Sequence, residues 1–300
     1  MYVITGATGN TGSVAAKRLL AQGKKVRVIG RNADRLQSLA AAGAEPFVAE
    51  VSDAAGLAKA FAGAEGVYAI IPPNTASTEP LADRERVTNA LVTALTNSGV
   101  KHVVSLSSVG ADKTDETGPV VGLHQLEEKL NSIPGLNTLH LRAGYFMENT
   151  LGQAGAIKMF GMTAGPIRSD LKLPFIATQD IGEAAAAALV QQNFTGHQTR
   201  ELLGQRDLTM AEVATIIGKA IGKPGLGYVR LPNMQIKPAL MQLGMSKQVA
   251  DLILEMADAL NSGHMCALEP RCAANTTPTS FEDFVAKVFV PAYEGKARVA

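Results

Sequence analysis

The stretch Ile4-Thr-Gly6-Ala-Thr-Gly9-Asn-Thr-Gly12 decides the fold of this chain. An apolar run precedes it and a helical pattern follows it, so its three glycines lie in the turn of a first strand–helix unit. Gly6 permits the tight turn, Gly9 lets backbone N–H groups approach a pyrophosphate, and Gly12 brings the helix close to the strand. The spacing G-x-x-G-x-x-G differs from the common G-x-G-x-x-G, but in this position it predicts a dinucleotide-binding site.

Short apolar runs alternate with helical patterns through the first 150 residues, as in parallel strands joined by crossover helices. The runs are nearly continuous in Val, Ile and Leu, which is typical of strands buried on both faces. We expect strands at residues 2–5, 25–30, 46–48, 66–71, 102–106 and 138–142, and helices at residues 11–21, 33–42, 54–61, 81–98 and 123–131. The predicted fold class is therefore α/β, a doubly wound (Rossmann) parallel sheet whose ligand crevice lies at the carboxyl ends of the strands.

The pattern changes after residue 150. Residues 152–174 are rich in Gly, Met and Pro and predict an irregular segment over the crevice, and Asp180 is expected to cap a helix at 180–191. Further along we expect strands at residues 201–204 and 228–231, helices at 209–221, 234–243 and 247–261, and a last helix that starts with a capping box at 279–282. These elements predict a smaller, mostly helical C-terminal substrate lobe.

The expected division places a dinucleotide-binding domain at residues 1–150, to which residues 176–192 return, and the substrate lobe at residues 151–175 and 193–300. The methionines and aromatics of the irregular segment and the lobe are expected to form an adaptable apolar pocket or to fill the core. They are Met159, Phe160, Met162, Met234, Met241 and Met245.

Composition excludes several classes of protein. The 28 Lys and Arg residues nearly balance the 27 Asp and Glu residues, and no run of basic residues offers a surface for nucleic acid by itself. The longest apolar stretch, residues 184–190, is too short to span a membrane, and we expect no signal peptide. Two cysteines give no disulfide framework, which favours the cytoplasm. We expect no metal site, because His264, Cys266 and Cys272 lack a metal-binding spacing.

Arg31 stands at the end of the second expected strand, where a site that prefers NAD(H) usually carries Asp or Glu to hold the ribose 2′-hydroxyl. A guanidinium can instead bind a 2′-phosphate with its planar set of donors. NADP(H) is therefore the preferred cofactor and NAD(H) the alternative, unless Arg31 is merely a solvated surface residue. Asp53 follows the third strand, where it can accept a hydrogen bond from the adenine amino group, cap the next helix, or do both.

Five segments together resemble the atypical short-chain dehydrogenase/reductases, specifically the NmrA-like family. They are Gly6–Gly12, Arg31-Asn32, Ile70-Ile-Pro72-Pro73, Leu141-Arg-Ala-Gly-Tyr-Phe-Met-Glu-Asn149 and Asp180-Ile-Gly182. The resemblance covers about the first 190 residues and, more loosely, the lobe. The family includes NADPH-dependent quinone and triphenylmethane-dye reductases as well as NADP-binding regulators with little or no catalysis.

The chain departs from the larger superfamily in one respect that bears on its chemistry. Typical members use a Ser together with a Tyr-x-x-x-Lys pair, in which the lysine lowers the pKa of the proton-donating tyrosine. None of the five tyrosines here has a lysine four residues on; they are Tyr2, Tyr68, Tyr145, Tyr228 and Tyr293. Matched to the helix that normally carries the pair, His124 stands at the lysine position, a residue near Val120 at the tyrosine position, and Ser107 or Ser108 at the serine position.

The absence of the Tyr-x-x-x-Lys pair limits the reactions that this chain is expected to catalyse. Oxidation of an alcohol or reduction of a simple ketone needs a positioned acid or base, whereas quinones, conjugated enones and cationic dyes give a stabilised product after hydride addition. His124 is a candidate proton donor near neutral pH, or a structural histidine that binds the ribose or a serine. The resemblance places Tyr145 beside the nicotinamide, where its ring could contact a planar substrate or belong to the core.

These observations define the expected site. The candidate catalytic residues are His124, Ser108 and Tyr145. The candidate cofactor-binding residues are Gly6, Thr8, Gly9, Asn10, Thr11, Gly12, Arg31, Asp53, Ile71, Pro72, Ala143 and Tyr145. The expected function is an NAD(P)H-dependent oxidoreductase that transfers hydride to a small planar electrophile such as a quinone. The alternative is an NADP(H)-sensing regulator with little or no catalysis, which would require a protein partner.

Overall fold

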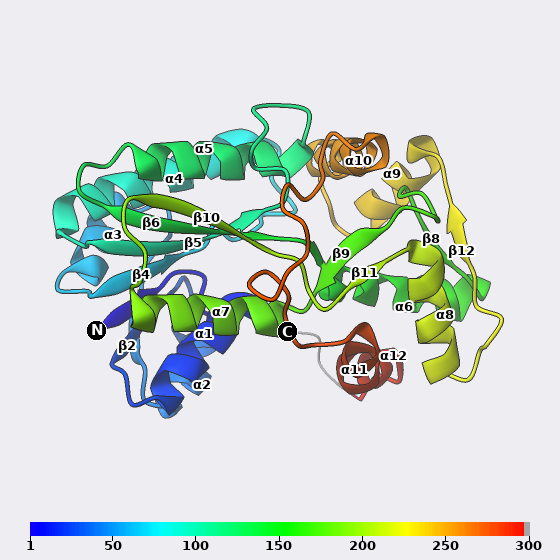
Figure 1. Cartoon of the computed structure of the whole chain (residues 1–300), viewed down its shortest axis with the longest axis horizontal. Coiled ribbons are helices and arrows are strands. Elements are labelled where there is room, and N and C mark those ends of the chain that lie inside the picture. Colours follow the sequence, from blue (N-terminus) through cyan, green and yellow to red (C-terminus); the bar gives the residue numbers. More distant parts are fainter. Residues whose placement is uncertain (297–300) are drawn as a thin grey trace.

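The computed structural model describes residues 1–296, and within them seven strands form one parallel sheet in the order β10-β6-β5-β4-β1-β2-β3 (Figure 1). Its strands are β1 (Tyr2–Ile4), β2 (Val26–Gly30), β3 (Glu45–Val48), β4 (Gly66–Ala69), β5 (His102–Ser108), β6 (Asn137–Ala143) and β10 (His197–Leu202). The chain winds outward from β1 in one direction to β3 and from β4 in the other direction to β10. This order confirms the predicted doubly wound sheet and puts a switch point between β1 and β4, where ligands bind in such folds.

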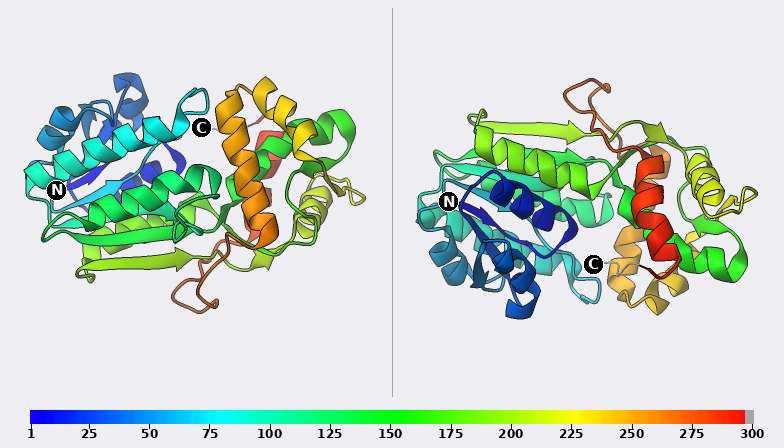
Figure 2. Two further views of the ribbon diagram at one scale, coloured as in Figure 1. Left: turned by 90° about the horizontal axis from the view of Figure 1, so that it is seen from above. Right: turned by 90° about the horizontal axis from the view of Figure 1, so that it is seen from below.

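Helices cover both faces of the sheet (Figures 1 and 2). One face carries α3 (Ala54–Phe61), α4 (Pro80–Ser98) and α5 (Val121–Asn131), and the other carries α1 (Asn10–Ala21), α2 (Ala33–Ala41) and α7 (Thr178–Gln191). Each layer encloses its own apolar core, because the strands between them present buried side chains on both sides. The helices expected in the first 150 residues are all present, with ends that differ from expectation by at most two residues.

Close packing between α1 and α7 fixes the position of the glycine-rich turn. A Cβ atom at Gly182 on α7 would lie 2.6 Å from the carbonyl oxygen of Thr11, so only glycine permits this approach of the two helices. At Gly12 a Cβ atom would overlap the carbonyl oxygen of Gly6. The predicted close approach of the first helix to the first strand is therefore confirmed.

The lobe lies beyond the carboxyl ends of the strands and has a separate apolar core (Figure 1). It contains β7 (Tyr145–Phe146), η2 (Met147–Gly152), α6 (Gln153–Phe160), β8 (Thr163–Gly165), β9 (Leu173–Ile176), β11 (Asp207–Leu208), α8 (Met210–Ala220), β12 (Tyr228–Arg230), α9 (Asn233–Gln242) and α10 (Lys247–Ser262). A short turn, η1 (Gly118–Val120), precedes α5, and the last helical segment comprises α11 (Phe281–Phe284), η3 (Val285–Phe289) and α12 (Val290–Tyr293).

Three expectations about this half of the chain are wrong. The strand expected at 201–204 is β10, which pairs with β6 in the main sheet and not with the lobe, although residues 193–300 were assigned to the lobe. Residues 152–174 are not irregular, because they form α6, β8 and the start of β9. The last helix is capped by Ser280, whose hydroxyl accepts from the N–H of Asp283, so no capping box spans 279–282. The division into two domains otherwise stays a prediction.

Asp180 also differs from its expected role as a helix cap. It lies inside the first turn of α7, and its carboxylate accepts hydrogen bonds from the backbone N–H and hydroxyl of Thr279, far along the chain. At the N-terminus of α7, the carboxylate of Glu148 instead accepts hydrogen bonds from the backbone N–H and the hydroxyl of Thr178. Both carboxylates thus connect segments that sequence proximity does not bring together.

Within residues 1–296, none of the helices combines the length and the apolar character that crossing a bilayer requires.

Candidate functional site

A cavity of about 1020 Å³ lies at the carboxyl ends of the strands, between the sheet and the lobe. Its walls come from the loops that follow β1, β2, β3 and β4, from the ends of β5 and β6, and from α10 of the lobe. This is the position where a doubly wound sheet binds ligands. All of the expected cofactor residues except Gly12 and Asp53 lie in its lining, and contact between them and a cofactor stays a prediction.

The glycine-rich turn forms one end of the cavity. Gly6 has a φ of 57°, a left-handed conformation that favours glycine, and the N–H of Gly9 donates to the carbonyl oxygen of Gly6 at 3.0 Å. Gly9 is the N-cap of α1, and no side chain in the described part of the protein caps this helix. An uncapped helix N-terminus offers N–H groups and a partial positive charge to an anion, so the turn fits a pyrophosphate.

Arg31 and Arg35 stand beside this turn, at the end of β2 and on α2, and both side chains are exposed. Neither makes an ion pair within residues 1–296. Asn32 between them caps α2 by accepting from the N–H of Asp34 at 2.7 Å. The two guanidinium groups therefore remain available to a phosphate at this end of the cavity. Glu50, after β3, lies in the same part of the lining and was not expected from the sequence.

Asp53 lies outside the lining. Its carboxylate accepts hydrogen bonds from the N–H groups of Ala55 and Gly56, at 3.1 and 3.0 Å, and caps α3. Of the two roles considered for Asp53, the geometry supports the helix cap.

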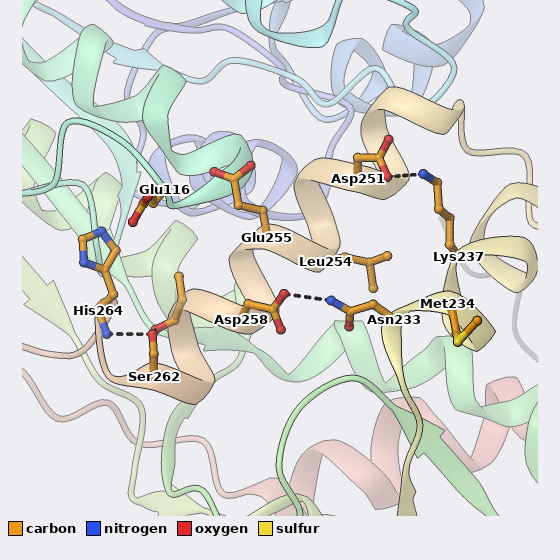
Figure 3. Close-up of a pocket in the computed structure, with 11 residues that line it drawn as sticks. Glu116, Asn233, Met234, Lys237, Asp251, Leu254, Glu255, Asp258, Ser262 and His264 are labelled. Carbon is orange, nitrogen blue, oxygen red and sulfur yellow. Dashed lines mark hydrogen bonds and ion pairs between the residues drawn. The ribbon is translucent and has the colours of Figure 1, made fainter.

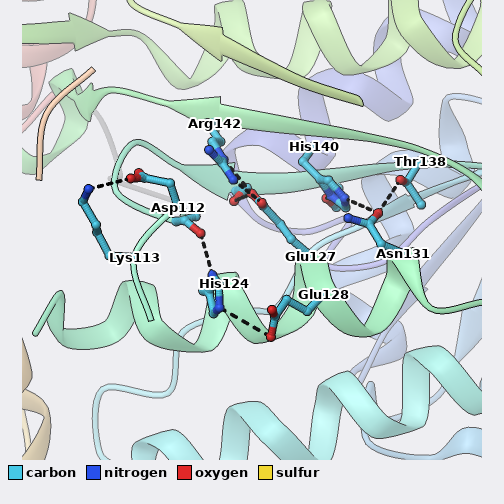
Figure 4. A network of polar contacts seen from close by, with 12 residues as sticks. Asp112, Lys113, His124, Glu127, Glu128, Asn131, Thr138, His140 and Arg142 are labelled. Atoms are coloured by element: carbon cyan, nitrogen blue, oxygen red, sulfur yellow. Dashed lines mark hydrogen bonds and ion pairs between the residues drawn. The ribbon is translucent and has the colours of Figure 1, made fainter. Parts of the chain in front are cut away.

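Ser107 and Ser108 end β5 and both line the cavity. Ser108 donates to the carbonyl oxygen of Val109 at 2.9 Å. Ser107 donates to the carboxylate of Glu127 on α5, which also accepts two hydrogen bonds from Arg142 on β6, at 3.0 and 2.6 Å (Figure 4). The bond to Glu127 raises the pKa of Arg142. This buried ion pair leaves the oxygen of Ser107 as an acceptor toward the cavity.

His124 lies outside the cavity lining. Its Nδ1 is 2.9 Å from the carbonyl oxygen of Ala111, and its Nε2 is 3.4 Å from the carboxylate of Glu128 on the same helix (Figure 4). Both ring nitrogens are thus directed to the protein rather than to the cavity. The expected role of His124 as a proton donor has no support from this geometry, and its partners are Ala111 and Glu128 rather than the serine considered as the structural alternative.

Tyr145, at the start of β7, lines the cavity, and its ring centroid lies 5.1 Å from that of Phe175. Burial raises the pKa of Tyr145 to about 12, although a hydrogen bond from Asn149 acts in the opposite direction. A paired lysine would lower this pKa instead. Tyr145 therefore stays protonated and is suited to hydrogen bonding and ring contact rather than to rapid proton transfer.

The lobe closes the cavity with apolar side chains. Ile253, Met256 and Leu260 project from one face of α10, and Leu173 and Met265 add to the same wall. None of the expected pocket residues lies in the lining: Met159, Phe160, Met162, Met234 and Met241 are exposed on the surface of α6, α9 and their loops, and Met245, after α9, is half-buried. The expected type of wall is confirmed, but the residues assigned to it are wrong.

A second, more open hollow lies between α9 and α10, and four of its eleven lining residues are acidic (Figure 3). Asp251 pairs with Lys237, and Asp258 accepts from the side chain of Asn233 at 2.8 Å. Among residues 1–296 there is no group of His, Cys, Asp or Glu side chains arranged to hold a metal ion. Two carboxylates of the hollow, Asp251 and Asp258, are thus bound by neighbouring side chains, and Glu255 accepts from the N–H of Gly118.

Comparison of the sequence with known proteins identifies its family and its relatives. The model of the NmrA-like family matches residues 2–285. The chain belongs to the NmrA-like family. It is 28% identical over 260 residues to an NAD(P)H azoreductase of Xenophilus azovorans (85% of this chain, 86% of the relative) and 28% identical over 260 residues to quinone oxidoreductase 2 of Escherichia coli, with the same coverage.

Solved structures of this NmrA-like type also share the fold. The NADPH complex of the quinone oxidoreductase from Escherichia coli aligns with a TM-score of 0.75 at 24% identity, covering 96% of this chain and all of that one. The triphenylmethane reductase of Citrobacter aligns with a TM-score of 0.76 at 19% identity, covering 96% and 99% of the two chains. The predicted family and fold class are confirmed.

Proposed function

We propose that this protein is an NADPH-dependent reductase that delivers hydride to a small planar electrophile such as a quinone. One observation carries the proposal: a single cavity runs from the uncapped N-terminus of α1 to the apolar wall of α10. Such a cavity has room for a dinucleotide with its nicotinamide end beside a second, apolar ligand. Family relatives that are named NAD(P)H azoreductase and quinone oxidoreductase support the same reading.

Preference for NADPH is supported by the charges at the turn. Arg31 and Arg35 line the cavity without ion-pair partners in the described chain, and β2 ends without a carboxylate. A guanidinium attracts a 2′-phosphate, whereas a carboxylate there would repel it. The cofactor, once bound, supplies the hydride.

The residues around the reacting end support an electrophile that needs no strong acid. Tyr145 can donate a hydrogen bond, but no cation in the described structure acidifies it, and burial raises its pKa to about 12. The hydroxyl of Ser108 donates to the carbonyl oxygen of Val109. The hydroxyl of Ser107 already donates a hydrogen bond to the carboxylate of Glu127. Quinones and conjugated dyes accept hydride into an extended system and take their proton from water afterwards, so these residues suffice to orient them.

Two measurements test the proposal. Purified protein mixed with NADPH and a panel of quinones and azo dyes should oxidise the cofactor, followed at its absorbance maximum, and NADH should bind more weakly than NADPH by calorimetry. Arg31→Ser should weaken NADPH binding by roughly 10- to 100-fold and leave NADH binding nearly unchanged. Lys17→Ser, on the exposed side of α1, serves as the control for loss of a surface charge.

The alternative, a cofactor-sensing regulator, predicts a different result. Equal affinity for NADPH and NADP⁺, no turnover across the panel, and a protein partner whose binding depends on the cofactor would contradict the reductase proposal. The proposed reductase requires no protein partner, only a small-molecule substrate. We place the protein in the cytoplasm because both Cys266 and Cys272 are free thiols.

A further inference from the structure

Arg84 on α4 is a charged residue in a part of the cavity that otherwise lacks charge. The charged residues of the lining are Arg31, Arg35, Glu50 and Arg84. The first three stand near the ends of β2 and β3, on the side of the switch point where the adenosine half of a dinucleotide binds. Arg84 follows β4, on the other side, and shares its wall with Val120 and Leu123 beside the lobe.

The fold holds the stem of Arg84 against the start of α5. A Cβ atom at Gly122 would lie only 2.7 Å from Cδ of Arg84 and 3.2 Å from its Cβ, so the arginine side chain fills the space that a side chain at 122 would need. The stem is thereby fixed between α4 and α5 while the side chain lines the cavity. This packing makes Arg84 a built part of the wall rather than a mobile surface charge.

Arg84 is half-buried, and this burial lowers the pKa of its guanidinium. Within residues 1–296 it has no hydrogen bond and no ion pair, unlike Arg142, whose guanidinium is bound by Glu127. A guanidinium remains charged at any working pH, and Arg84 is partly withdrawn from solvent with no protein partner for this charge. An oxygen ligand in the cavity would supply the missing partner.

We propose that Arg84 binds the substrate oxygen that carries, or acquires, negative charge during reduction. The inference rests on the proposed reductase function and names its substrate class as planar conjugated carbonyl compounds, including those with an anionic substituent. A charge-assisted hydrogen bond from a fixed guanidinium would orient such a substrate and favour the state in which its oxygen is most negative.

The role of Arg84 follows from how the electrons and the proton move. A hydride adds to the conjugated electrophile, the displaced π-electron pair moves to the carbonyl oxygen, and the nicotinamide is oxidised. The resulting oxyanion takes a proton from water, and the carbon that received the hydride then loses a proton to solvent while the second carbonyl oxygen gains one. In total, a quinone, NADPH and H⁺ give a hydroquinone and NADP⁺. Arg84 cannot supply this proton, but it stabilises the oxyanion until water does, as a pre-positioned donor does in an oxyanion hole.

Three variants test the inference. Arg84→Met removes the charge and keeps most of the apolar stem, and Arg84→Lys keeps the charge but loses the planar set of donors. Arg86→Met is the matched control, because Arg86 lies on the same helix but is exposed and paired with Asp83. Thermal melting checks that each variant folds.

The first readout is binding without turnover. Protein saturated with NADP⁺ is titrated with anthraquinone-2-sulfonate by calorimetry, and Arg84→Met should weaken its binding by roughly 10- to 100-fold, with Arg84→Lys between it and the wild type. The second readout is kinetic. With neutral 1,4-naphthoquinone, Arg84→Met should lower kcat/KM by about tenfold or more, while the Kd for NADPH changes less than twofold. Arg86→Met should behave as the wild type in both.

Two results would overturn the inference: unchanged sulfonate binding and kinetics in a folded Arg84→Met, or a loss confined to NADPH affinity, which would assign Arg84 to the cofactor. The failure of the proposed function is distinguishable. A wild-type protein that binds NADPH and the sulfonate without turnover would contradict the reductase proposal, whereas weaker sulfonate binding by Arg84→Met would still support Arg84 as the residue that binds substrate-type oxygens.

Discussion

Gly12 lies where α1 passes directly over the turn that precedes it. A Cβ atom at this position would overlap the carbonyl oxygen of Gly6, which is backbone and cannot rotate away. Gly12→Ala should therefore shift the start of α1, lower the free energy of unfolding by about 1–3 kcal/mol, and weaken NADPH binding by more than tenfold. Urea unfolding and calorimetric titration measure the two effects separately.

Gly155 provides the control for this substitution. It lies on α6 in the lobe, and a Cβ atom there would meet nothing within 4 Å. Gly155→Ala should leave NADPH binding unchanged and stabilise the protein slightly, since alanine favours a helix more than glycine by about 0.5–1 kcal/mol. An unaltered cofactor affinity in Gly12→Ala would contradict the role assigned to the glycine-rich turn.

At the scale of single residues, the sequence was sufficient where chemistry is local. Gly6 and Arg31 could be placed at the cofactor crevice from the sequence, because Gly6 lies in the turn after the first strand and Arg31 lies at the end of the second. Arg84 and Glu127 could not, because an arginine or glutamate on a helix normally faces solvent. Only tertiary packing, which brings Arg84 against Gly122 and Glu127 against Arg142, reveals that these charges are buried. The one signal that the sequence offered was a glycine, Gly122, on the helix that packs against Arg84.

Among the elements, β5, β6 and α5 share a chain of buried polar groups (Figure 4). Nδ1 of His140 lies 2.6 Å from the hydroxyl of Ser105, and Nε2 lies 2.9 Å from the side-chain oxygen of Asn131, which also accepts from Thr138. With Asn131 as acceptor, Nε2 carries the proton and Nδ1 accepts from Ser105. The neutral ring therefore satisfies all of these groups, whereas a second proton on Nδ1 would turn Ser105 into the acceptor and leave its hydroxyl hydrogen without this partner.

Burial lowers the pKa of His140 from 6.5 to about 4, with Glu127 opposing this shift and Arg142 and His197 adding to it. Above pH 6.5 the ring is neutral in both states, so it contributes no pH dependence. As the pH falls below 6.5, the unfolded chain binds a proton that the folded protein does not, and stability is lost until about pH 4. Between pH 7 and pH 5 this loss should amount to about 2 kcal/mol.

Urea unfolding at pH 7 and pH 5 measures this loss. His140→Gln should flatten the difference between the two pH values by about 2 kcal/mol, whatever the substitution costs at pH 7. His264→Gln, which removes a partly exposed histidine near the open hollow, serves as the control for the loss of a histidine. An equal slope in His140→Gln and the wild type would show that His140 is not the group responsible.

Prediction of elements succeeded where burial on both faces gives a continuous apolar run, as in β1, β2 and β5. It missed the first half of β10, expected only from residue 201, because this edge strand begins with the exposed, polar His197, Gln198 and Thr199. It failed for α6 because glycines in and around the helix resemble a loop. The short pairs β7–β9 and β8–β12 join segments far apart in the chain, which local patterns do not encode.

For the molecule as a whole, the segment 265–280 returns from α10 past the sheet to the C-terminal helix, crossing between the two halves (Figure 1). Two buried carboxylates of the nucleotide-binding half hold it. Glu201 on β10 accepts from the N–H groups of Leu268 and Glu269, and Asp180 on α7 accepts from Thr279. Because Met265 at the start of this segment lines the cavity, these contacts couple the cavity wall to the sheet.

Asp180→Ala tests this coupling. The variant leaves the N–H and hydroxyl of Thr279 without their acceptor, which should cost about 1–3 kcal/mol and speed hydrogen exchange across residues 268–293 more than in α1 or β5. Asp170→Ala, which removes an exposed carboxylate paired with Arg168, should change stability by less than about 0.5 kcal/mol.

If the contact holds the two halves together around the cavity, saturating NADPH should slow hydrogen exchange in residues 268–293 of the wild type, and should slow it less in Asp180→Ala. Protection that is equal in both proteins would show that the segment is held by its apolar packing alone.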